Sequence, residues 1–485
     1  MNQTFEVGRA HQLTERLSTL RQGRKTFVLF VAIGVACMVE GLDIVSMSVV
    51  LPHIKVLFHL SPQDVGLLAA ASTFGITLGA LPTGLLADRF GRRKTLLAGF
   101  LVCSCFTFLS GVAADYWMLV VCRFASGLGM AAIFAMPYGL VSEVVPSARR
   151  GMYVSIVETF LGLGYLLAPV FGLVCFGFIR QDYAWRVDLI LSGLPALFFF
   201  FIRRNVIESP KWLISKDRLD EAEAIISRLE EWGSTTTPRS SLVEKVLPAA
   251  PRTAFLENRL SISKALRTVF SAPLIWQWIA LGGGVFGVFA VFYVAIAFLP
   301  SVFLARGLSY THSLWYALVA TAFQVPGKIC MSILGDRIGR KAAFGICIVL
   351  AALFLGLFCY FTDPISTMFF STAFLFFIAG SGPLCKLWYA ELFPTACRAT
   401  GQNIVEGFFG RLLGGVVWVS VFPVLTHHFG QNQVLAYVAA MLVILSIPAL
   451  LFTPETRKHS APIESDVARE SPESGDGLRS GVSGG

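Results

Sequence analysis

Charged residues are scarce in this sequence. Only 14% of its 485 residues are Asp, Glu, Lys or Arg, whereas 55% are hydrophobic. A typical soluble domain carries about 25% charged residues, so the composition excludes an ordinary water-soluble globular domain. Acidic residues are the scarcer kind: 30 Asp and Glu stand against 39 Lys and Arg, which leaves a net charge of +9.

Patterns typical of reactive sites are also missing. The ten cysteines show no paired spacing and no ligand pattern with the seven histidines, so the sequence indicates neither a disulfide framework nor a metal site. No glycine-rich phosphate-binding loop and no nucleophile–base arrangement stands out. We therefore predict that the chain is not an enzyme and that it uses no cofactor and no metal.

Long apolar runs are abundant instead. Twelve of them have roughly the 20 residues that cross a bilayer. Hydrocarbon offers the backbone no partner, and the runs are too uniformly apolar for barrel strands, so each is predicted to be a transmembrane helix. The predicted spans are 26 to 52, 63 to 87, 95 to 114, 116 to 141, 152 to 178, 187 to 202, 271 to 300, 310 to 334, 342 to 361, 365 to 390, 402 to 426 and 432 to 452.

Basic residues indicate the orientation of these spans. Placing both termini in the cytoplasm puts 31 of the 39 Lys and Arg on that side, and only Lys55, Arg180, Arg186 and Arg306 outside. Cytoplasmic loops of membrane proteins carry such an excess. The net charge is thereby explained by topology, and no nucleic-acid partner is predicted. The polar segment 1 to 25 precedes a run too long for a signal-peptide core, so we expect it to be retained.

An eighteen-residue phrase occurs twice. "EVVPSARRGMYVSIVETF" begins at Glu143, and "ELFPTACRATGQNIVEGF" begins at Glu391, 248 positions later; "DRFGRR" at 88 returns as "DRIGRK" at 336 with the same shift. One offset shared by separate motifs indicates an internal duplication of six helices. Parallel repeats of this kind are typical of alternating-access transporters, whose site lies between the halves near the midplane.

Three motifs carry a family resemblance. "GLLADRFGRRK" at 84 to 94 resembles the loop signature of the major facilitator superfamily, and "ESPKWL" at 208 to 213 and "PET" at 454 to 456 resemble segments of its sugar-porter and organic-acid symporter branches. The resemblance implies the major facilitator fold, an all-α membrane protein of 12 helices in two parallel six-helix repeats. We expect a multi-pass monomer in the cytoplasmic (inner) membrane.

The duplicated polar residues are predicted to act as conformational switches at the inner face. Glycines beside them permit tight turns, and ion pairs there can form in one arrangement of the halves and break in the other. The simpler alternative is a set of positive-inside anchors, but acids contribute little to topology. The predicted switch residues are Asp88, Arg92, Glu143, Arg150, Asp336, Arg340, Glu391 and Arg398.

Charged residues within the spans are the candidates for proton coupling. Ionisable groups are costly in hydrocarbon and are usually functional. Glu40 and Asp43 are three apart in the first span, and Arg123 of the fourth span lies at a depth similar to that of Asp43. An acid in helix one beside an Arg in helix four also resembles the coupling pair of proton-driven facilitators. The alternative is a static buried ion pair between the two helices.

Further charges lie deeper along the predicted pathway. Glu158 and Glu406 are expected at the inner gate, and the resemblance implies that Glu158 pairs with Lys328 across the cavity. This pair would close the inner gate, or else be an inert structural bridge. Arg411 lies near the midplane, where its guanidinium could bind a carboxylate in a bidentate manner, or else pair with Glu406. Lys386 is expected to extend toward the inner surface. Candidate cavity residues, each open to a plain packing role, are Tyr138, Tyr293, Gln324, Trp315 and Trp388.

The remaining segments are polar. Residues 1 to 25 form a cytoplasmic tail, 26 to 202 and 271 to 456 the two six-helix bundles, and 203 to 270 a linker with an amphipathic helix from Asp217 to Trp232. Its apolar face is expected to lie against the inner side of the bundle. Residues 457 to 485, rich in Ser, Gly and Glu, are predicted to be disordered.

These features predict a secondary transporter that takes up a small organic anion together with protons. Buried acids would supply protonation, and Arg123, Lys328 and Arg411 a positive potential for a carboxylate. A carboxylate can also coordinate sodium, which is the alternative to protons. A sugar or polyol remains open as the substrate, although helix seven has only Gln277 where sugar porters present paired glutamines. Export of drugs or cations also remains open, as does a non-transporting membrane sensor.

Overall fold

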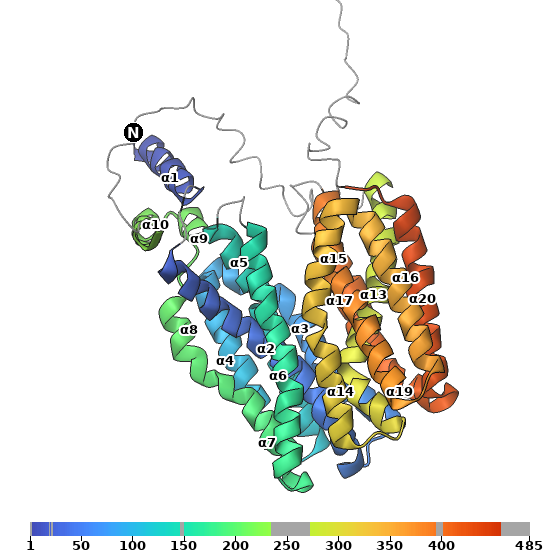
Figure 1. Cartoon of the computed structure of the whole chain (residues 1–485). Helices are drawn as coiled ribbons and strands as arrows, with labels where there is room; N and C mark the ends of the chain where they lie inside the picture. The colour runs from blue at the N-terminus through green and yellow to red at the C-terminus, as the bar shows by residue number, and fades with distance from the viewer. Residues whose placement is uncertain are drawn as a thin grey trace, which may run out of the picture.

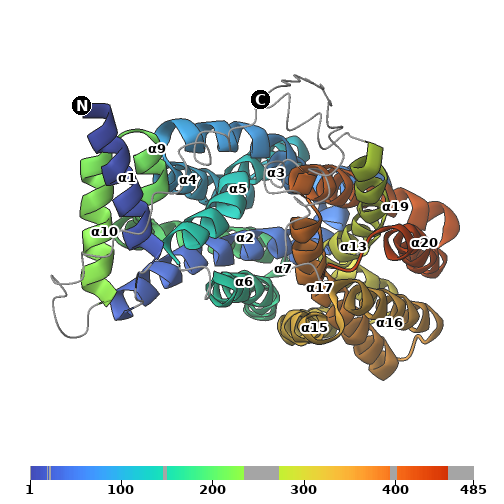
Figure 2. The ribbon, with the colours of Figure 1, turned by 90° about the horizontal axis from the view of Figure 1, so that it is seen from above.

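A computed structural model describes residues 2–18, 20, 23–145, 150–233, 272–393 and 401–456. Within these ranges, twelve helical segments are long and apolar enough to cross a membrane. They form two bundles that stand side by side, one from each half of the chain (Figures 1 and 2). The fold is all-α, as predicted.

The N-terminal half contains six spanning segments, the last of which is built from three consecutive pieces. Its helices are α2 (Arg24–Leu57), α3 (Pro62–Phe90), α4 (Arg92–Gly111), α5 (Tyr116–Val144), α6 (Arg150–Phe178), α7 (Gln181–Gly193), the 3₁₀ turn η2 (Leu194–Phe198) and α8 (Phe199–Asn205).

The C-terminal half repeats this order. Its helices are α13 (Ala272–Ala305), α14 (Tyr310–Ala322), α15 (Gln324–Ile338), α16 (Arg340–Tyr360), α17 (Pro364–Leu392), the π-helix η3 (Asn403–Val417), α19 (Trp418–Phe429) and α20 (Gln431–Phe452). Of the predicted switch residues, Arg398 lies outside the described part of the chain, and Arg150 is described only as the first residue of α6. The predicted disordered tail from 457 onward lies outside it too.

The repeat extends to the helix caps. Ser61 caps α3 and Ser309 caps α14, and Asp115 and Asp363 cap α5 and α17, each pair again 248 positions apart. These side chains accept a hydrogen bond from a backbone N–H in the first helical turn, which would otherwise lack a partner. The duplication therefore determines where helices begin as well as which loop residues recur.

Three spans depart from the prediction. The sixth begins at Gln181, before the predicted residue 187, so Arg186 lies within α7, where it donates to the carbonyls of Gly111 and Ala113. The eighth is interrupted at Phe323, between α14 and α15. The eleventh is wound as a π-helix over fifteen residues, a geometry that is rare in proteins and often lies at functional sites.

Three short helices lie at the outer edge of one end of the N-terminal half, which we call the tail face: α1 (Asn2–Ser18), α9 (Pro210–Ser215) and α10 (Leu219–Gly233) (Figure 1). The predicted amphipathic helix corresponds to α10. Its buried residues are Leu219, Ala222, Ile226 and Leu229. Helix α1 was not expected from the sequence.

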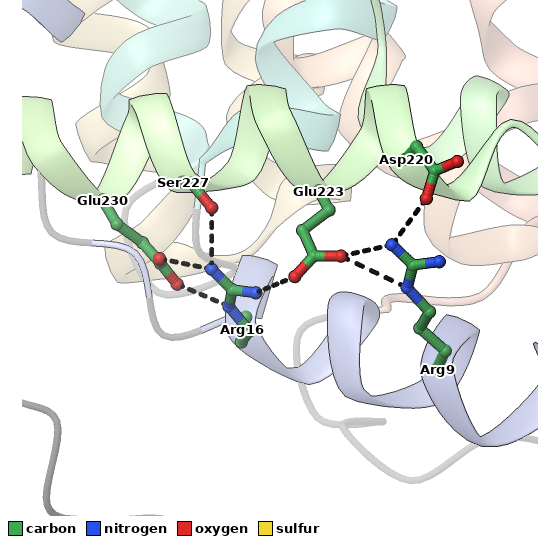
Figure 3. Close-up of polar contacts among 6 residues, drawn as sticks. All are labelled: Arg9, Arg16, Asp220, Glu223, Ser227 and Glu230. Atoms are coloured by element: carbon green, nitrogen blue, oxygen red, sulfur yellow. Dashed lines mark hydrogen bonds and ion pairs between the residues drawn. The ribbon is translucent and has the colours of Figure 1, made fainter.

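Helix α1 is attached to α10 by both charge and apolar packing. Arg9 pairs with Asp220 and Glu223 at 2.7 and 2.5 Å, and Arg16 pairs with Glu230 at 2.6 Å (Figure 3). On the buried side of α1, Leu13 and Leu17 are almost fully enclosed. The tail face of the N-terminal half therefore carries a packed group of helices at its outer edge.

The two halves meet most closely at the opposite end, which we call the far face. There the Tyr310 hydroxyl donates to the carbonyl of Val49, and the Tyr310 ring packs on Phe176. Helices α3 and α19 approach so closely that a Cβ on Gly66 would collide with the carbonyl of Ser420. The halves are thus in contact across the far face.

Candidate functional site

Six charged side chains gather between the halves. The three acids are Glu40 of α2, Glu158 of α6 and Glu406 of η3; the three cations are Lys328 of α15, Lys386 of α17 and Arg411 of η3. Electrostatic interactions connect Glu40 to Arg411, Glu158 and both lysines, and connect Lys386 to Glu406. We call these six residues the central cluster; its formal charges balance.

Glu158 connects the two halves. Its carboxylate lies 3.1 Å from Lys328 Nζ and 3.2 Å from Lys386 Nζ, both in the C-terminal half, and accepts a hydrogen bond of 2.9 Å from the Tyr138 hydroxyl. The predicted pair with Lys328 is present. The expectation that Lys386 extends to the surface is wrong, because the Glu158 carboxylate holds its ammonium group in the cluster.

The π-helix places Glu406 beside Arg411. An α-helix turns by about 100° per residue, so side chains five apart point in different directions, whereas the wider π winding brings residues i and i+5 together. Arg411 Nη2 lies 3.0 Å from Glu406 Oε1, and the Tyr389 hydroxyl also donates to Glu406. The guanidinium of Arg411 lies over the ring of Phe134, with its Cζ 3.4 Å from the ring centroid.

The two acids of α2 have different surroundings. Asp43 is fully buried: Arg123 donates to both of its carboxylate oxygens, at 2.7 and 3.0 Å, and to its backbone carbonyl, and the Thr107 hydroxyl donates to it as well. Glu40 is 3% exposed and, among the described residues, makes no hydrogen bond or ion pair. Asp43 is therefore the acid that forms the ion pair, whereas Glu40 is the member of the central cluster that makes no hydrogen bond or ion pair among the described residues.

Aromatic and amide side chains line the space around the cluster. Tyr293 packs against Phe289 and Phe292, and Phe292 contacts Tyr165 of the other half. Gln324, at the break between α14 and α15, is 1% exposed, and neither its amide nitrogen nor its amide oxygen has a partner.

A small space next to Gln324 crosses the interface between the halves. Its walls include Ser48 and Pro169 from the N-terminal half and Thr321 from the C-terminal half. Two predicted cavity residues lie elsewhere. Trp315 is 51% exposed on the bundle surface, and Trp388 is fully buried, donating to the carbonyl of Pro454.

The predicted switch residues form a network at the tail face of the N-terminal half. Arg92 forms an ion pair with Glu143, to which the Ser209 hydroxyl also donates. Burial raises the pKa of the Glu143 carboxyl, an effect that the Arg92 guanidinium opposes. Glu208 accepts hydrogen bonds of 2.7 and 3.0 Å from the backbone N–H groups of Arg92 and Arg93, at the start of α4.

The C-terminal half contains the matching network. Arg340 lies 2.5 Å from Asp336 and 3.8 Å from Glu391, which accepts a hydrogen bond from Thr456. Glu455 accepts from the backbone N–H groups of Arg340 and Lys341. Asp88 differs from its counterpart Asp336, because its exposed side chain makes no pair among the described residues. Both networks connect residues within one half only.

A sequence model of the sugar (and other) transporter family matches residues 28–462, nearly the whole chain. The protein belongs to this transporter family. Its fold is that of the major facilitator superfamily, and it is a multi-pass membrane protein. Its duplicated tail-face loops and its central cluster are thus parts of a membrane transporter for small molecules.

Curated relatives of this transporter are similar over most of their length. The niacin transporter of Acinetobacter baylyi is 27% identical over 90% of this chain and 96% of its own. The arabinose-proton symporter of Bacillus subtilis is 25% identical over 93% of this chain and 97% of its own. The sequence identity to both relatives is too low to assign either substrate to this protein.

Solved structures agree in fold. The inward-open xylose transporter XylE from E. coli superimposes with a TM-score of 0.71 at 20% identity, covering 91% of this transporter and 99% of XylE. A bacterial homologue of the lysosomal transporter Spinster, in an inward-facing conformation, gives a TM-score of 0.68 at 15% identity, covering 88% and 96%. At these identities the likeness concerns the fold alone.

Sequence reasoning missed several residues of this transporter's site. Tyr165 lies two helical turns after Glu158, on the same face, and that spacing could have revealed it. Glu208 and Glu455 each precede a hydroxyl residue in "ES" and "ET", but their offset is 247 and not 248, which hid the repeat. Phe134 and Tyr389 carry no local signal, because their roles depend on contacts with other helices.

Proposed function

We propose that this transporter takes up a small organic carboxylate together with protons by alternating access. The proposal rests on the charge balance of the central cluster. Three acids and three cations already neutralise one another, so an entering anion adds an uncompensated charge in a region of low dielectric. A proton bound at the same time restores neutrality.

Arg411 is the proposed anchor for the carboxylate. Guanidinium groups bind carboxylates with two parallel hydrogen bonds, and Arg411 is 7% exposed beside an aromatic ring, where such bonds are strong. Substrate binding would compete with Glu406 for this guanidinium. Lys328, Tyr293, Tyr138 and Gln324 are the other proposed contacts, with Gln324 supplying an unpaired donor and an unpaired acceptor.

Glu40 is the proposed acceptor of the transported proton. Protonation of Asp43 would have to displace Arg123, and it would leave a buried cation without a partner. Glu40 can take up a proton without breaking any hydrogen bond among the described residues. In this proposal the Asp43–Arg123 pair couples α2 to α5, and the tail-face networks, with Glu158 and Glu406 at the gate, change partners as the halves move.

The tail face is proposed to be cytoplasmic. It carries α1, α9, α10 and the basic loops at Arg92 and Arg340, in keeping with the excess of positive charge on cytoplasmic loops. In that orientation the far face lies on the outside, and it is closed in this structure. Symport down an inward proton gradient would carry the substrate inward.

The niacin transporter relative supports an anionic substrate, because niacin is a pyridine carboxylic acid. The arabinose-proton symporter relative supports proton coupling and makes a sugar the competing substrate. A matched pair of compounds separates the possibilities: nicotinate carries a carboxylate where nicotinamide carries a neutral amide of almost the same shape.

The test is transport by the purified protein in proteoliposomes. Counterflow is measured with labelled nicotinate, benzoate, nicotinamide, arabinose and xylose, each with and without an inward pH gradient. We expect accumulation of a carboxylate that depends on the pH gradient and collapses with a protonophore. Accumulation of a sugar and of no acid would refute the anion, and accumulation that is insensitive to the protonophore would refute proton coupling.

A further inference from the structure

A second buried acid lies outside the central cluster. Asp188 is on α7, about two turns from the end of the helix at the far face, and it is 0% exposed. Neither carboxylate oxygen makes a hydrogen bond. The matching helix of the C-terminal half, α20, contains no acidic residue, so Asp188 is not part of the repeated scaffold.

No positive charge compensates this carboxyl group. Burial is the only influence that acts on it appreciably among the described residues. Helix α7 packs on α2, α4 and α6, and the titratable neighbours are Cys175 of α6 and Tyr310 of the other half. His53, near the same end of α2, has a ring nitrogen without a partner. None of these is a fixed cation, and Arg186, two residues before Asp188 on α7, donates to the carbonyls of Gly111 and Ala113 and forms no ion pair with Asp188.

An ionised carboxylate without a counter-charge is not tolerated in such a place, because the loss of solvation costs several kcal/mol. The carboxyl group must therefore hold a proton in this conformation. Two donors lie close along the helix: Trp185 is three residues before and Ser192 four residues after, on the same buried face, and the indole N–H and the hydroxyl are both unpartnered. Small side-chain movements would let them donate to the ionised form.

The position of Asp188 connects it to closure of the far face. It lies within electrostatic reach of Tyr310, whose hydroxyl donates to Val49 and whose ring packs on Phe176. Separation of the halves would remove Tyr310 from this region and admit water. Hydration would lower the cost of ionisation and release the proton.

We propose that Asp188 is a second proton-binding site, separate from the central cluster, which is occupied while the halves are closed at the far face. The proton binds to a carboxylate oxygen on closure and leaves to solvent on opening. Acid therefore favours the closed far face. This site does not require the proposed function, because it concerns the protein without substrate.

A spin-label distance between the far-face ends of α2 and α19 tests this proposal. The full chain, without its native cysteines, carries Val56→Cys and Phe429→Cys and is held in lipid nanodiscs without substrate. Glu40→Gln is included so that the central acid cannot titrate. We expect the ratio of closed to open far face to rise as the pH falls, by up to about tenfold per pH unit, as binding of one proton allows.

Adding Asp188→Asn should abolish this pH dependence and leave the far face closed throughout, since the amide mimics the protonated acid. Asp182→Asn, an exposed acid on the same helix, is the matched control and should behave like its parent. The proposal is overturned if the ratio of closed to open far face does not depend on pH in the parent protein. It is also overturned if Asp188→Asn leaves that pH dependence unaltered.

A second measurement avoids the variants. In protein labelled with ¹³C-aspartate, infrared spectra at pH 7 should show the carbonyl band of a protonated aspartic acid, because Asp188 is the only described aspartate that is buried without a hydrogen bond or ion pair. Absence of that band would also overturn the proposal. Failure of the proposed function would appear only in the proteoliposome assay.

Discussion

At the scale of single residues, the two acids of α2 differ in what surrounds them. Sequence spacing places Glu40 and Asp43 on neighbouring positions of one helix, and it predicts Arg123 at the depth of Asp43. The structure gives the pair to Asp43, which accepts hydrogen bonds from both Arg123 and Thr107. The same mutation, acid to amide, should therefore have different effects at the two positions.

Replacing Glu40 with Gln should abolish accumulation driven by a pH gradient and preserve exchange of labelled for unlabelled substrate, because the amide cannot carry a proton but can occupy the same space. Both rates are measured in proteoliposomes. Asp43→Asn is the contrast: it leaves Arg123 buried without a counter-charge, which costs about 3–5 kcal/mol, so exchange should fail as well. Gradient-driven accumulation by Glu40→Gln would contradict the assignment.

Replacing Arg411 with Ala should weaken binding of the carboxylate by about 10- to 100-fold, because a hydrogen bond to a charged group contributes about 1.5–3 kcal/mol. Arg411→Lys should recover only part of the lost affinity, because an ammonium group cannot form the bidentate hydrogen bonds of a guanidinium. Binding is measured by titration calorimetry with nicotinate, and nicotinamide is the neutral control. Equal losses for both compounds would indicate a structural role for Arg411.

At the scale of elements, two irregular spans of the C-terminal half shape the site. The break between α14 and α15 presents Gln324, and the π winding of η3 brings Glu406 next to Arg411. The corresponding residues 155 to 169 of α6 are ordinary α-helix. The near-identical phrases "IVETF" and "IVEGF" thus form different helices, because winding depends on tertiary contacts and on the residues that follow.

The attachment of α1 to α10 is also an element-scale feature, and it leads to a prediction about the relative effects of two mutations. Leu13→Ala should loosen α1 strongly, because removing a buried leucine side chain costs about 2–5 kcal/mol. Arg16→Ala should have a small effect, about 0–1 kcal/mol, since its ion pairs are partly exposed. Proteolysis of the native protein within α1 measures both.

Gln12→Ala, on the exposed side of α1, is the matched control for these two mutations. Added salt should reduce the difference between wild type and Arg16→Ala, because it screens exposed charges, and should leave the effect of Leu13→Ala unchanged. A larger effect of Arg16→Ala than of Leu13→Ala would show that charge and not apolar packing attaches α1.

At the scale of the whole molecule, the contacts that connect the halves are unevenly distributed. The far face is closed by apolar packing and close backbone approach, whereas Glu158, held by two lysines, connects the halves toward the tail face. The duplicated loop networks lie within single halves. They can therefore stabilise each half as a rigid unit, while a few contacts between the halves decide which face is open.

Spin labels should reveal reciprocal motion of the two faces. One pair is placed at Val56 and Phe429 on the far face, and the other at Phe90 and Ile338, exposed residues at the tail-face ends of α3 and α15. Because each half moves as a unit, we expect the first distance to lengthen whenever the second shortens, as measured by pulsed electron paramagnetic resonance with and without substrate. Distances that change in the same direction would exclude alternating access.

Removing the charge of Glu158 should shift this equilibrium toward an open tail face. In Glu158→Gln the amide can no longer form ion pairs with Lys328 and Lys386, so two ion pairs between the halves are lost. The tail-face distance between the labels at Phe90 and Ile338 should increase. Arg218→Gln, which removes a surface pair on the tail face, serves as the control and should leave that distance unchanged.

The sequence by itself determined the fold class, twelve spans within a few residues and the internal duplication, because apolar length, basic loops and repeated motifs are local properties of the chain. It also identified the buried charged residues as candidates for function, because ionisable groups in hydrocarbon are energetically costly and are usually functional. Helix depth also predicted the pair of Asp43 with Arg123, but the tertiary structure alone decided the other partners: Glu40 makes no ion pair, Lys386 turns inward to Glu158, and Asp188 has no partner among the described residues. Pairing depends on distances between helices far apart in sequence, and no local pattern encodes those distances.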